Sequence, residues 1–195
     1  MGVASASICD AGRVNMKTLF LDSGHSVKFQ GANGEVVWVR KITGYLKPLL
    51  DAKKWNVVVV PDSYWLDLSS NRNLINRISF INKNCHDGDW VLSVHGNSAL
   101  NAKARGVTTC YMGGSLVAHN YAKSLSTAYS VATGVPLFGD GAFDDRTGRF
   151  GRIGMVRDTR PMALLIEAGF VSNSQDMKTD PKVAAIAIAD WFNKL

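Results

Sequence analysis

Three polar residues of this chain have the types and positions that could build a reactive site. His25 lies just beyond an apolar run at residues 17–22, and His95 closes a second run at residues 90–95. Glu35 stands where the pattern changes to that of a helix. Ligands of α/β proteins bind beyond the carboxyl ends of the strands, so we expect the three side chains at one edge of a sheet.

Two imidazoles and a carboxylate suffice to hold a catalytic Zn²⁺ ion, which takes three protein ligands and keeps a fourth position for water. The ion lowers the pKa of that water to about 7 and polarises a scissile carbonyl. A structural interpretation also fits the same residues. In it Glu35 complements a helix dipole, and each histidine is a hydrogen-bonded surface or core residue.

A fourth residue, Glu167, gives the zinc hypothesis its context. It directly follows the apolar run at residues 163–166 and precedes Ala168. An ionised carboxylate is costly to bury without a partner. One interpretation pairs it with an arginine from a nearby set: Arg146, Arg149, Arg152 and Arg157. We favour the other, in which Glu167 is the general base beside an activated water.

Strand-like and helix-like stretches alternate along the chain, which predicts a single α/β domain. We expect a twisted, mostly parallel central sheet with helices on both faces. The expected strands are 17–22, 56–60, 90–95, 107–111 and 162–167. The expected helices start near Glu35 and near Ser69, span 116–132, and run from the Asp180 cap to the end of the chain.

Three local features give sharper expectations. The β-branched run 56–60, ended by Pro61, is typical of a strand buried on both faces. Residues 137–154 contain many glycines and have no sustained period, so we expect a long loop or hairpin there. In the helix 116–132 the proposed core residues are these: Leu116, Ala118, Leu125 and Ala128.

Composition limits the classes of function. The chain has 195 residues and is 46% apolar, which suits one catalytic domain at 16–195 after an N-terminal extension or arm at 1–15. The net charge of +6 is spread without a basic run, so we expect no nucleic-acid partner. No apolar run could span a bilayer, and we expect neither membrane insertion nor a signal peptide. Three cysteines without CxxC spacing favour free thiols.

Several motifs occur in an order that resembles a known family. Residues 22–25 read Asp-Ser-Gly-His, Gly34 precedes Glu35, residues 93–97 read Ser-Val-His-Gly-Asn, and residues 167–173 read Glu-Ala-Gly-Phe-Val-Ser-Asn. In this order they resemble the zinc N-acetylmuramoyl-L-alanine amidases of the amidase type 3 family. The segment from Ser26 to Gly31 departs from the family's glycine-rich loop.

Two further parts of the chain bear on the resemblance. Leu74, Arg77 and Asn82 are similar to the helix that precedes the second histidine of the family. Thr108 or Thr109 stands where many relatives have an acidic residue.

The resemblance implies an activity and a set of roles. It implies hydrolysis of the amide bond between N-acetylmuramic acid and L-alanine in peptidoglycan, with Zn²⁺ as cofactor and His25, Glu35 and His95 as its ligands. Glu167 becomes the acid and base. Asn97 and Arg157 are candidate substrate contacts, and Asp22 or Ser23 are candidates to support a histidine.

Two other functions stay open on the sequence. One is a zinc peptidase that cuts a different peptide bond of peptidoglycan, and the other is a catalytically silent module that binds the cell wall or builds a virion. The absence of an export signal favours a phage endolysin, present in the host cytoplasm before release to the wall, or a virion-associated lysin. We expect a monomer.

Overall fold

The computed structural model describes residues 16–25, 31–51, 54–61, 70–148 and 151–195. The predicted arm at 1–15, the possible cap at Ser69 and most of the unusual segment after His25 lie outside the described residues. No helix among the described residues is long and apolar enough to cross a membrane.

Six strands and five α-helices alternate along the described chain. The strands are β1 (Thr18–Asp22), β2 (Asn56–Val59), β3 (Trp90–Asn97), β4 (Val107–Tyr111), β5 (Leu137–Asp144) and β6 (Met162–Phe170). The helices are α1 (Glu35–Asp51), α2 (Ser70–Asn84), α3 (Leu116–Thr133), α4 (Gly154–Arg157) and α5 (Pro181–Phe192), and a 3₁₀ turn η2 spans Asp176–Lys178.

All six strands form one sheet, in the order β2-β1-β3-β6-β4-β5. Neighbouring strands are parallel except β4 and β6, which are antiparallel. The predicted mostly parallel sheet is therefore confirmed. The one antiparallel pair places Thr108 opposite Glu167.

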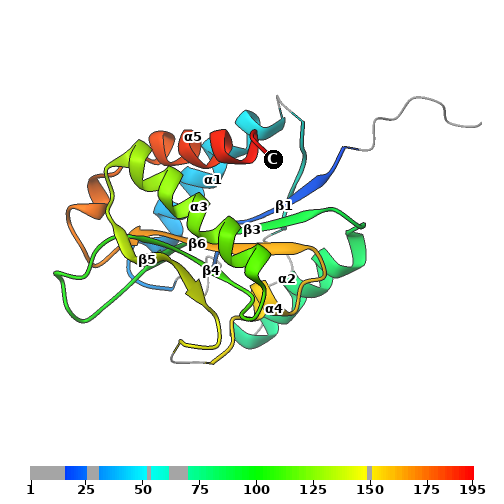
Figure 1. Cartoon of the computed structure of the whole chain (residues 1–195), viewed down its shortest axis with the longest axis horizontal. Helices are drawn as coiled ribbons and strands as arrows, with labels where there is room; N and C mark the ends of the chain where they lie inside the picture. The colour runs from blue at the N-terminus through cyan, green and yellow to red at the C-terminus, as the bar shows by residue number, and fades with distance from the viewer. Residues whose placement is uncertain (1–15, 26–30, 52–53, 62–69, 149–150) are drawn as a thin grey trace, which may run out of the picture.

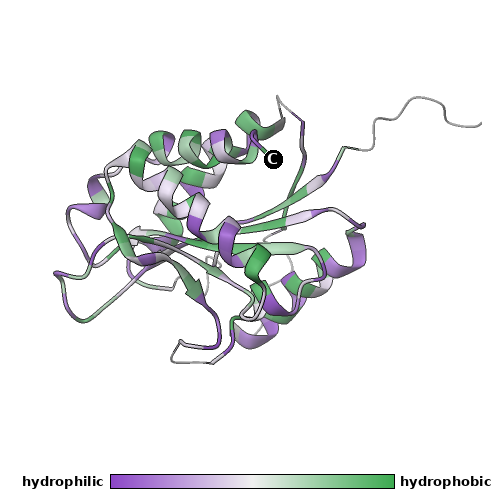
Figure 2. Cartoon of the chain, in the orientation of Figure 1, coloured by the Kyte–Doolittle hydropathy of each residue, from purple (hydrophilic) through white to green (hydrophobic). Residues whose placement is uncertain are grey.

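Helices cover both faces of the sheet, as predicted. Helices α1, α3 and α5 pack on one face, and α2 and α4 pack on the other (Figure 1). Leu19 and Leu21 of β1 face the first core and Phe20 faces the second, because successive side chains of a strand point to opposite faces. Figure 2 shows the hydrophobic strands inside and the hydrophilic residues gathered on outer helix surfaces and loops.

The run at 56–60 is a strand, but its predicted burial on both faces is wrong. Strand β2 lies at the edge of the sheet, where Val57 and Val60 are buried and Val59 is 41% exposed. An uninterrupted β-branched run does not distinguish an edge strand from a central one. Only the order of the strands in the sheet makes that distinction.

The expected long loop at 137–154 is also wrong for its first half. Residues 137–144 form β5, an edge strand that pairs with β4, with a register shift between Val107 and Thr109. Gly139 and Gly141 both adopt positive φ in this strand, so the irregular backbone masks the alternation that a strand otherwise shows.

Helix α3 confirms most of the predicted core residues and corrects one. Ala118 and Leu125 are buried, and Ala128 packs against the core, but Leu116 is 73% exposed. The buried face of α3 is formed by Ala118, Ala122, Leu125, Ser126 and Tyr129. This spacing follows the helical period, which turns the side chain of Leu116 away from the sheet.

The C-terminal helix begins as predicted. The side chain of Asp180 accepts a hydrogen bond from the backbone N–H of Lys182, and Pro181 occupies the first turn. The helix ends at Phe192, three residues before the predicted end.

Candidate active site

Three separate elements bring His25, Glu35 and His95 together. The histidine after β1 and the histidine of β3 both approach the carboxylate at the first residue of α1. Glu35 Oε1 lies 3.2 Å from His25 Nε2 and 3.1 Å from His95 Nδ1. The possible ligand atoms of the three residues all lie within 4.8 Å of one another. The predicted meeting of these side chains at one sheet edge is confirmed.

The chemistry of this group fits a Zn²⁺ ion. Two imidazole nitrogens and one carboxylate oxygen are the donors of known catalytic zinc sites. Glu35 is 3% exposed, and its oxygens accept hydrogen bonds from the backbone N–H groups of Ala32 and Gly96. These bonds fix the carboxylate, and α1 itself offers the positive end of its dipole there.

Glu35 stays ionised in this setting. Burial by itself raises the pKa of a carboxyl group, but hydrogen bonds from His25 and His95 hold the pKa of Glu35 well below its ordinary value. A metal-binding carboxylate must be deprotonated, and this one is so at neutral pH.

Two glycines make room for the group. A Cβ at Gly31 would lie 2.3 Å from Glu35 Oε2 and 2.6 Å from His25 Nε2. A Cβ at Gly24 would lie 2.6 Å from the carbonyl oxygen of Val94. A side chain at Gly31 would therefore overlap possible ligand atoms of Glu35 and His25, and one at Gly24 would overlap the backbone just before His95.

Glu167 lies beside this group, in the middle of β6. It pairs in register with His95 on β3, and paired residues of neighbouring strands project to the same face. Its Oε2 is shielded from solvent and has no hydrogen-bond partner among the described residues. Burial raises the pKa of Glu167 to about 7, with Glu35 adding to the rise and His95 opposing it. Such a carboxyl group can take and return a proton near neutral pH.

The alternative pairing of Glu167 with an arginine is wrong for the three arginines that the structure describes. Each of them is committed to an aspartate: Arg146 to Asp144, Arg152 to Asp158 and Arg157 to Asp145. Arg149, the fourth candidate, lies outside the described residues.

The two candidate substrate contacts, Asn97 and Arg157, lie in different surroundings. Asn97 ends β3 next to the group, and its side-chain oxygen accepts a hydrogen bond from the N–H of Ser98. Arg157 binds the buried carboxylate of Asp145, with Nε 2.7 Å from Oδ2. No bond joins Arg157 to the His/Glu group within the described chain. Substrate contact by either residue stays a prediction.

Asp22 and Ser23 also have partners that the sequence did not reveal. The carboxylate of Asp22 binds Arg77 and Ser93, and the hydroxyl of Ser23 binds that of Thr43. Neither side chain is hydrogen-bonded to a histidine ring in the described part of the structure. For the Asp22–Arg77 pair the sequence did contain one signal, because Arg77 stands on the apolar face of α2, where a charged side chain needs a partner.

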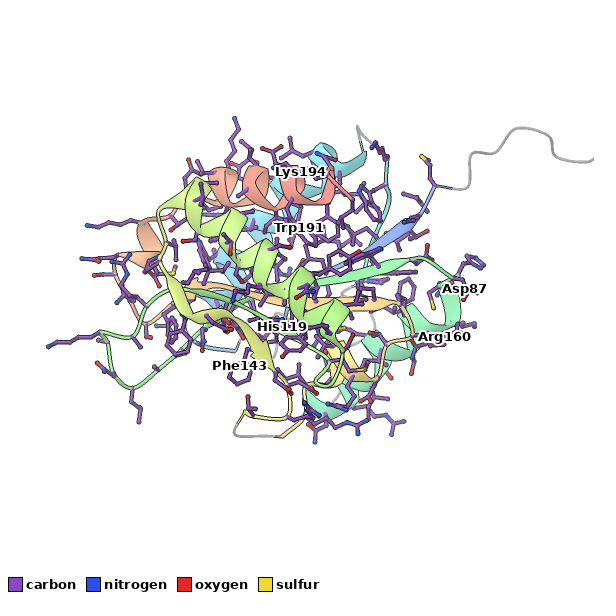
Figure 3. All side chains as sticks on the ribbon, viewed as in Figure 1. Asp87, His119, Phe143, Arg160, Trp191 and Lys194 are labelled. Carbon is purple, nitrogen blue, oxygen red and sulfur yellow. The ribbon has the colours of Figure 1, made fainter. Side chains whose placement is uncertain are left out.

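The amino end of the parallel strands is lined by cavities, and the described residues there form no second cluster of possible metal ligands. Two cavities of about 340 and 630 Å³ share Lys17, Asp87 and Asp89, at the amino ends of β1 and β3. Asp87 and Arg160 mark this end of the molecule in Figure 3. The carboxylate of Asp89 accepts hydrogen bonds from the backbone N–H groups of Thr18 and His86, so it holds this end of the fold together.

Comparison with known proteins places the whole arrangement in one family. The model of the family described as N-acetylmuramoyl-L-alanine amidase matches residues 19–187. The probable cell wall amidase LytH of Staphylococcus saprophyticus is 28% identical over 167 residues, which are 82% of this chain and 50% of that protein. The chain thus spans about half the length of this curated relative.

Solved structures share the fold. The catalytic domain of CwlV, an N-acetylmuramoyl-L-alanine amidase of Bacillus (Paenibacillus) polymyxa, superposes with a TM-score of 0.74 at 23% identity, covering 92% of this chain and 97% of that one. An N-acetylmuramoyl-L-alanine amidase of Clostridium difficile 630 gives a TM-score of 0.76 at 21% identity, covering 92% and 96%. Because the family model covers most of the chain and all four residues of the site, this protein belongs to the N-acetylmuramoyl-L-alanine amidase family.

Proposed function

We propose that this protein hydrolyses the amide bond between N-acetylmuramic acid and L-alanine in bacterial peptidoglycan, with His25, Glu35 and His95 as ligands of a Zn²⁺ ion. The observation that carries the proposal is Glu167, which pairs in register with His95 and whose Oε2 has no hydrogen-bond partner in the described part of the chain. A carboxylate oxygen that is shielded from water without a hydrogen bond is costly, so its presence here calls for a functional reason.

Each residue then has a defined task. When bound, Zn²⁺ supplies a Lewis acid that polarises the substrate carbonyl and lowers the pKa of water. Glu35 would hold the ion together with His25 and His95, and backbone N–H groups of Ala32 and Gly96 fix its carboxylate. Glu167 takes a proton from the attacking water and delivers it to the departing nitrogen of L-alanine. Its pKa of about 7 suits both steps, because the same group must bind and release a proton.

The two other functions keep the same fold and predict different products. A zinc peptidase would cut a peptide bond within the stem or crossbridge and leave L-alanine attached to the sugar. A silent module would bind the wall without cutting it. Membership of the amidase family favours the first proposal over both. A monomeric state and a phage or virion origin remain predictions.

Purified sacculi test the proposal. We expect the protein to clear a sacculus suspension, to lose this activity on thorough chelation, and to regain it when zinc is added. Mass spectrometry of the products should find sugar strands without peptide and new L-alanine amino termini. The Glu167→Gln variant should bind sacculi and zinc as the wild type does and lower the rate at least 100-fold.

Three results would each contradict part of the proposal. Activity that survives chelation would show that the reaction does not need a metal ion. Cleavage at another bond would establish the peptidase, and wild-type protein that binds sacculi but never cuts them with zinc present would establish the silent module.

A further inference from the structure

The turn that carries His25 has a strained backbone. Gly24 adopts a φ of +49° and His25 a φ of +41°, and His25 is the only non-glycine residue with positive φ in the described chain. A residue with a Cβ rarely adopts this conformation. Such strain persists only where the surrounding structure over-determines the backbone, and it concentrates at functional sites.

A buried polar network fixes one side of this turn. Asp22 is 2% exposed, and both of its carboxylate oxygens lie 2.8 Å from Arg77 Nη1. Ser93 Oγ donates a 2.5 Å hydrogen bond to Asp22 Oδ2, and Arg77 Nε donates to Asn73 Oδ1. The network therefore joins the end of β1 to α2 and to β3, two residues before His95.

The next two residues fix the other side. Ser23 Oγ lies 2.9 Å from Thr43 Oγ1 on α1, the helix that begins with Glu35. Gly24 packs against the backbone of Val94 so closely that no side chain would fit. Three consecutive residues are thus each attached to a different neighbour.

Stability alone does not explain the buried ion pair in this network. Replacing such a pair with apolar residues of similar volume is often neutral or stabilising, because burial of two charges is costly. The bonds of Asp22 do, however, fix the backbone direction immediately before the strained turn.

We propose that Asp22, Arg77, Ser93 and Thr43 are positioning residues, which hold the strained turn so that His25 meets Glu35 and His95 in a geometry ready for metal. The inference rests on the proposed zinc site. It assigns a role to a network outside that site, and none of the four residues touches substrate or metal in this scheme.

The test compares two buried serines. Ser93→Ala removes the hydroxyl that binds Asp22. Ser126→Ala removes an equally buried hydroxyl on α3, which binds Thr109 of β4. Zinc affinity is measured by competition with a chelator, and the visible spectrum of the cobalt-substituted protein reports the coordination geometry. Urea unfolding of the metal-free proteins measures stability separately.

We expect Ser93→Ala to weaken zinc binding about 10- to 100-fold and to alter the cobalt spectrum. Both serine variants should lower the urea midpoint by similar amounts. Ser126→Ala, however, should leave zinc affinity and the cobalt spectrum unchanged. Thr43→Val, which keeps the shape of the side chain and loses its hydroxyl, should weaken zinc binding in the same direction as Ser93→Ala.

The outcomes separate this inference from the proposed function. If the wild type binds zinc and Ser93→Ala binds it equally well, the network is purely structural and the inference is wrong. The same conclusion follows if both serine variants lose affinity in proportion to their loss of stability. A wild type that does not bind zinc overturns the proposed site as well.

Discussion

The raised pKa of Glu167 lowers the stability of the folded chain near neutral pH. Its carboxyl group has a pKa of about 7 in the fold, compared with about 4.3 for glutamate in unfolded chains. The folded protein therefore holds this proton more tightly than the unfolded chain does. Below the unfolded value the group costs nothing; the cost then grows as the pH rises from about 4.3 to about 7, and it is complete above the folded pKa.

This imbalance predicts that Glu167→Gln stabilises the metal-free protein. At pH 8 the neutral amide removes the buried charge, and the free energy of unfolding should rise by about 2 kcal/mol. At pH 5 the wild-type carboxyl group is protonated in the fold, so the gain should shrink. Urea titrations of both proteins with a chelator at the two pH values measure the difference. A variant that is less stable than wild type at pH 8 would contradict the raised pKa.

Gly31 and Gly34 offer a matched pair of substitutions beside the proposed metal ligands. Both adopt positive φ, at +66° and +83°, so alanine strains the backbone at either position. A Cβ at Gly31 meets Glu35 and His25, whereas a Cβ at Gly34 meets no atom within 4 Å.

We therefore expect Gly31→Ala to abolish zinc binding and Gly34→Ala to retain it, with a loss of stability of about 1 kcal/mol from the backbone alone. Isothermal titration with zinc checks both proteins. Equal zinc affinity of the two variants would show that Gly31 does not pack against the ligands.

At the scale of elements, the site depends on which strands are neighbours. Strand β6 lies beside β3, although β4, α3, β5 and α4 separate them in the chain. The parallel register then places Glu167 next to His95. Both strands are apolar runs, and the local sequence of such a run does not predict which other strand it will pair with.

Helix α3 gives a test of element packing. Leu125 is fully buried and Leu116 is 73% exposed on the same helix. Leu125→Ala should lower the free energy of unfolding by about 2–5 kcal/mol, because it leaves a cavity in the core. Leu116→Ala should change it by less than about 0.5 kcal/mol. Denaturant titration distinguishes them, and a similar loss for both would mean that α3 is rotated relative to the fold described here.

At the scale of the whole molecule, the proposed metal would connect β1, α1 and β3. Because a ligand that binds only the folded state stabilises it by mass action, zinc at 100 times its dissociation constant should add about 2.7 kcal/mol to the free energy of unfolding. The midpoint temperature of thermal unfolding of the wild type should therefore rise when zinc is added.

The matched control for this shift is His95→Ala, which lacks one ligand and should show a much smaller shift. An equal shift in both proteins would place the bound zinc elsewhere on the surface.

The sequence by itself determined the type of fold, and it predicted the residues of the candidate site, which the structure brings together. Alternating apolar and amphipathic runs specify an α/β domain, because a strand and a helix each need a distinct period to bury one face. His25, Glu35, His95 and Glu167 were identified from residue type and position, since strand ends and helix starts form the ligand-binding edge of such sheets. The order of the motifs indicated the family.

Only the tertiary structure decided which residues pair. Arg77 binds Asp22 across 55 positions, and Arg146 and Arg157, two arginines that the sequence offered as partners of Glu167, bind aspartates instead. Strand β2 became an edge and β4 reversed its direction against β6, which no local pattern records. These outcomes depend on chain topology, because long-range contacts form between segments whose local sequences are compatible with several partners. That same topology places Glu167 beside His95 with its Oε2 unpaired among the described residues, and the proposed chemistry rests on this arrangement.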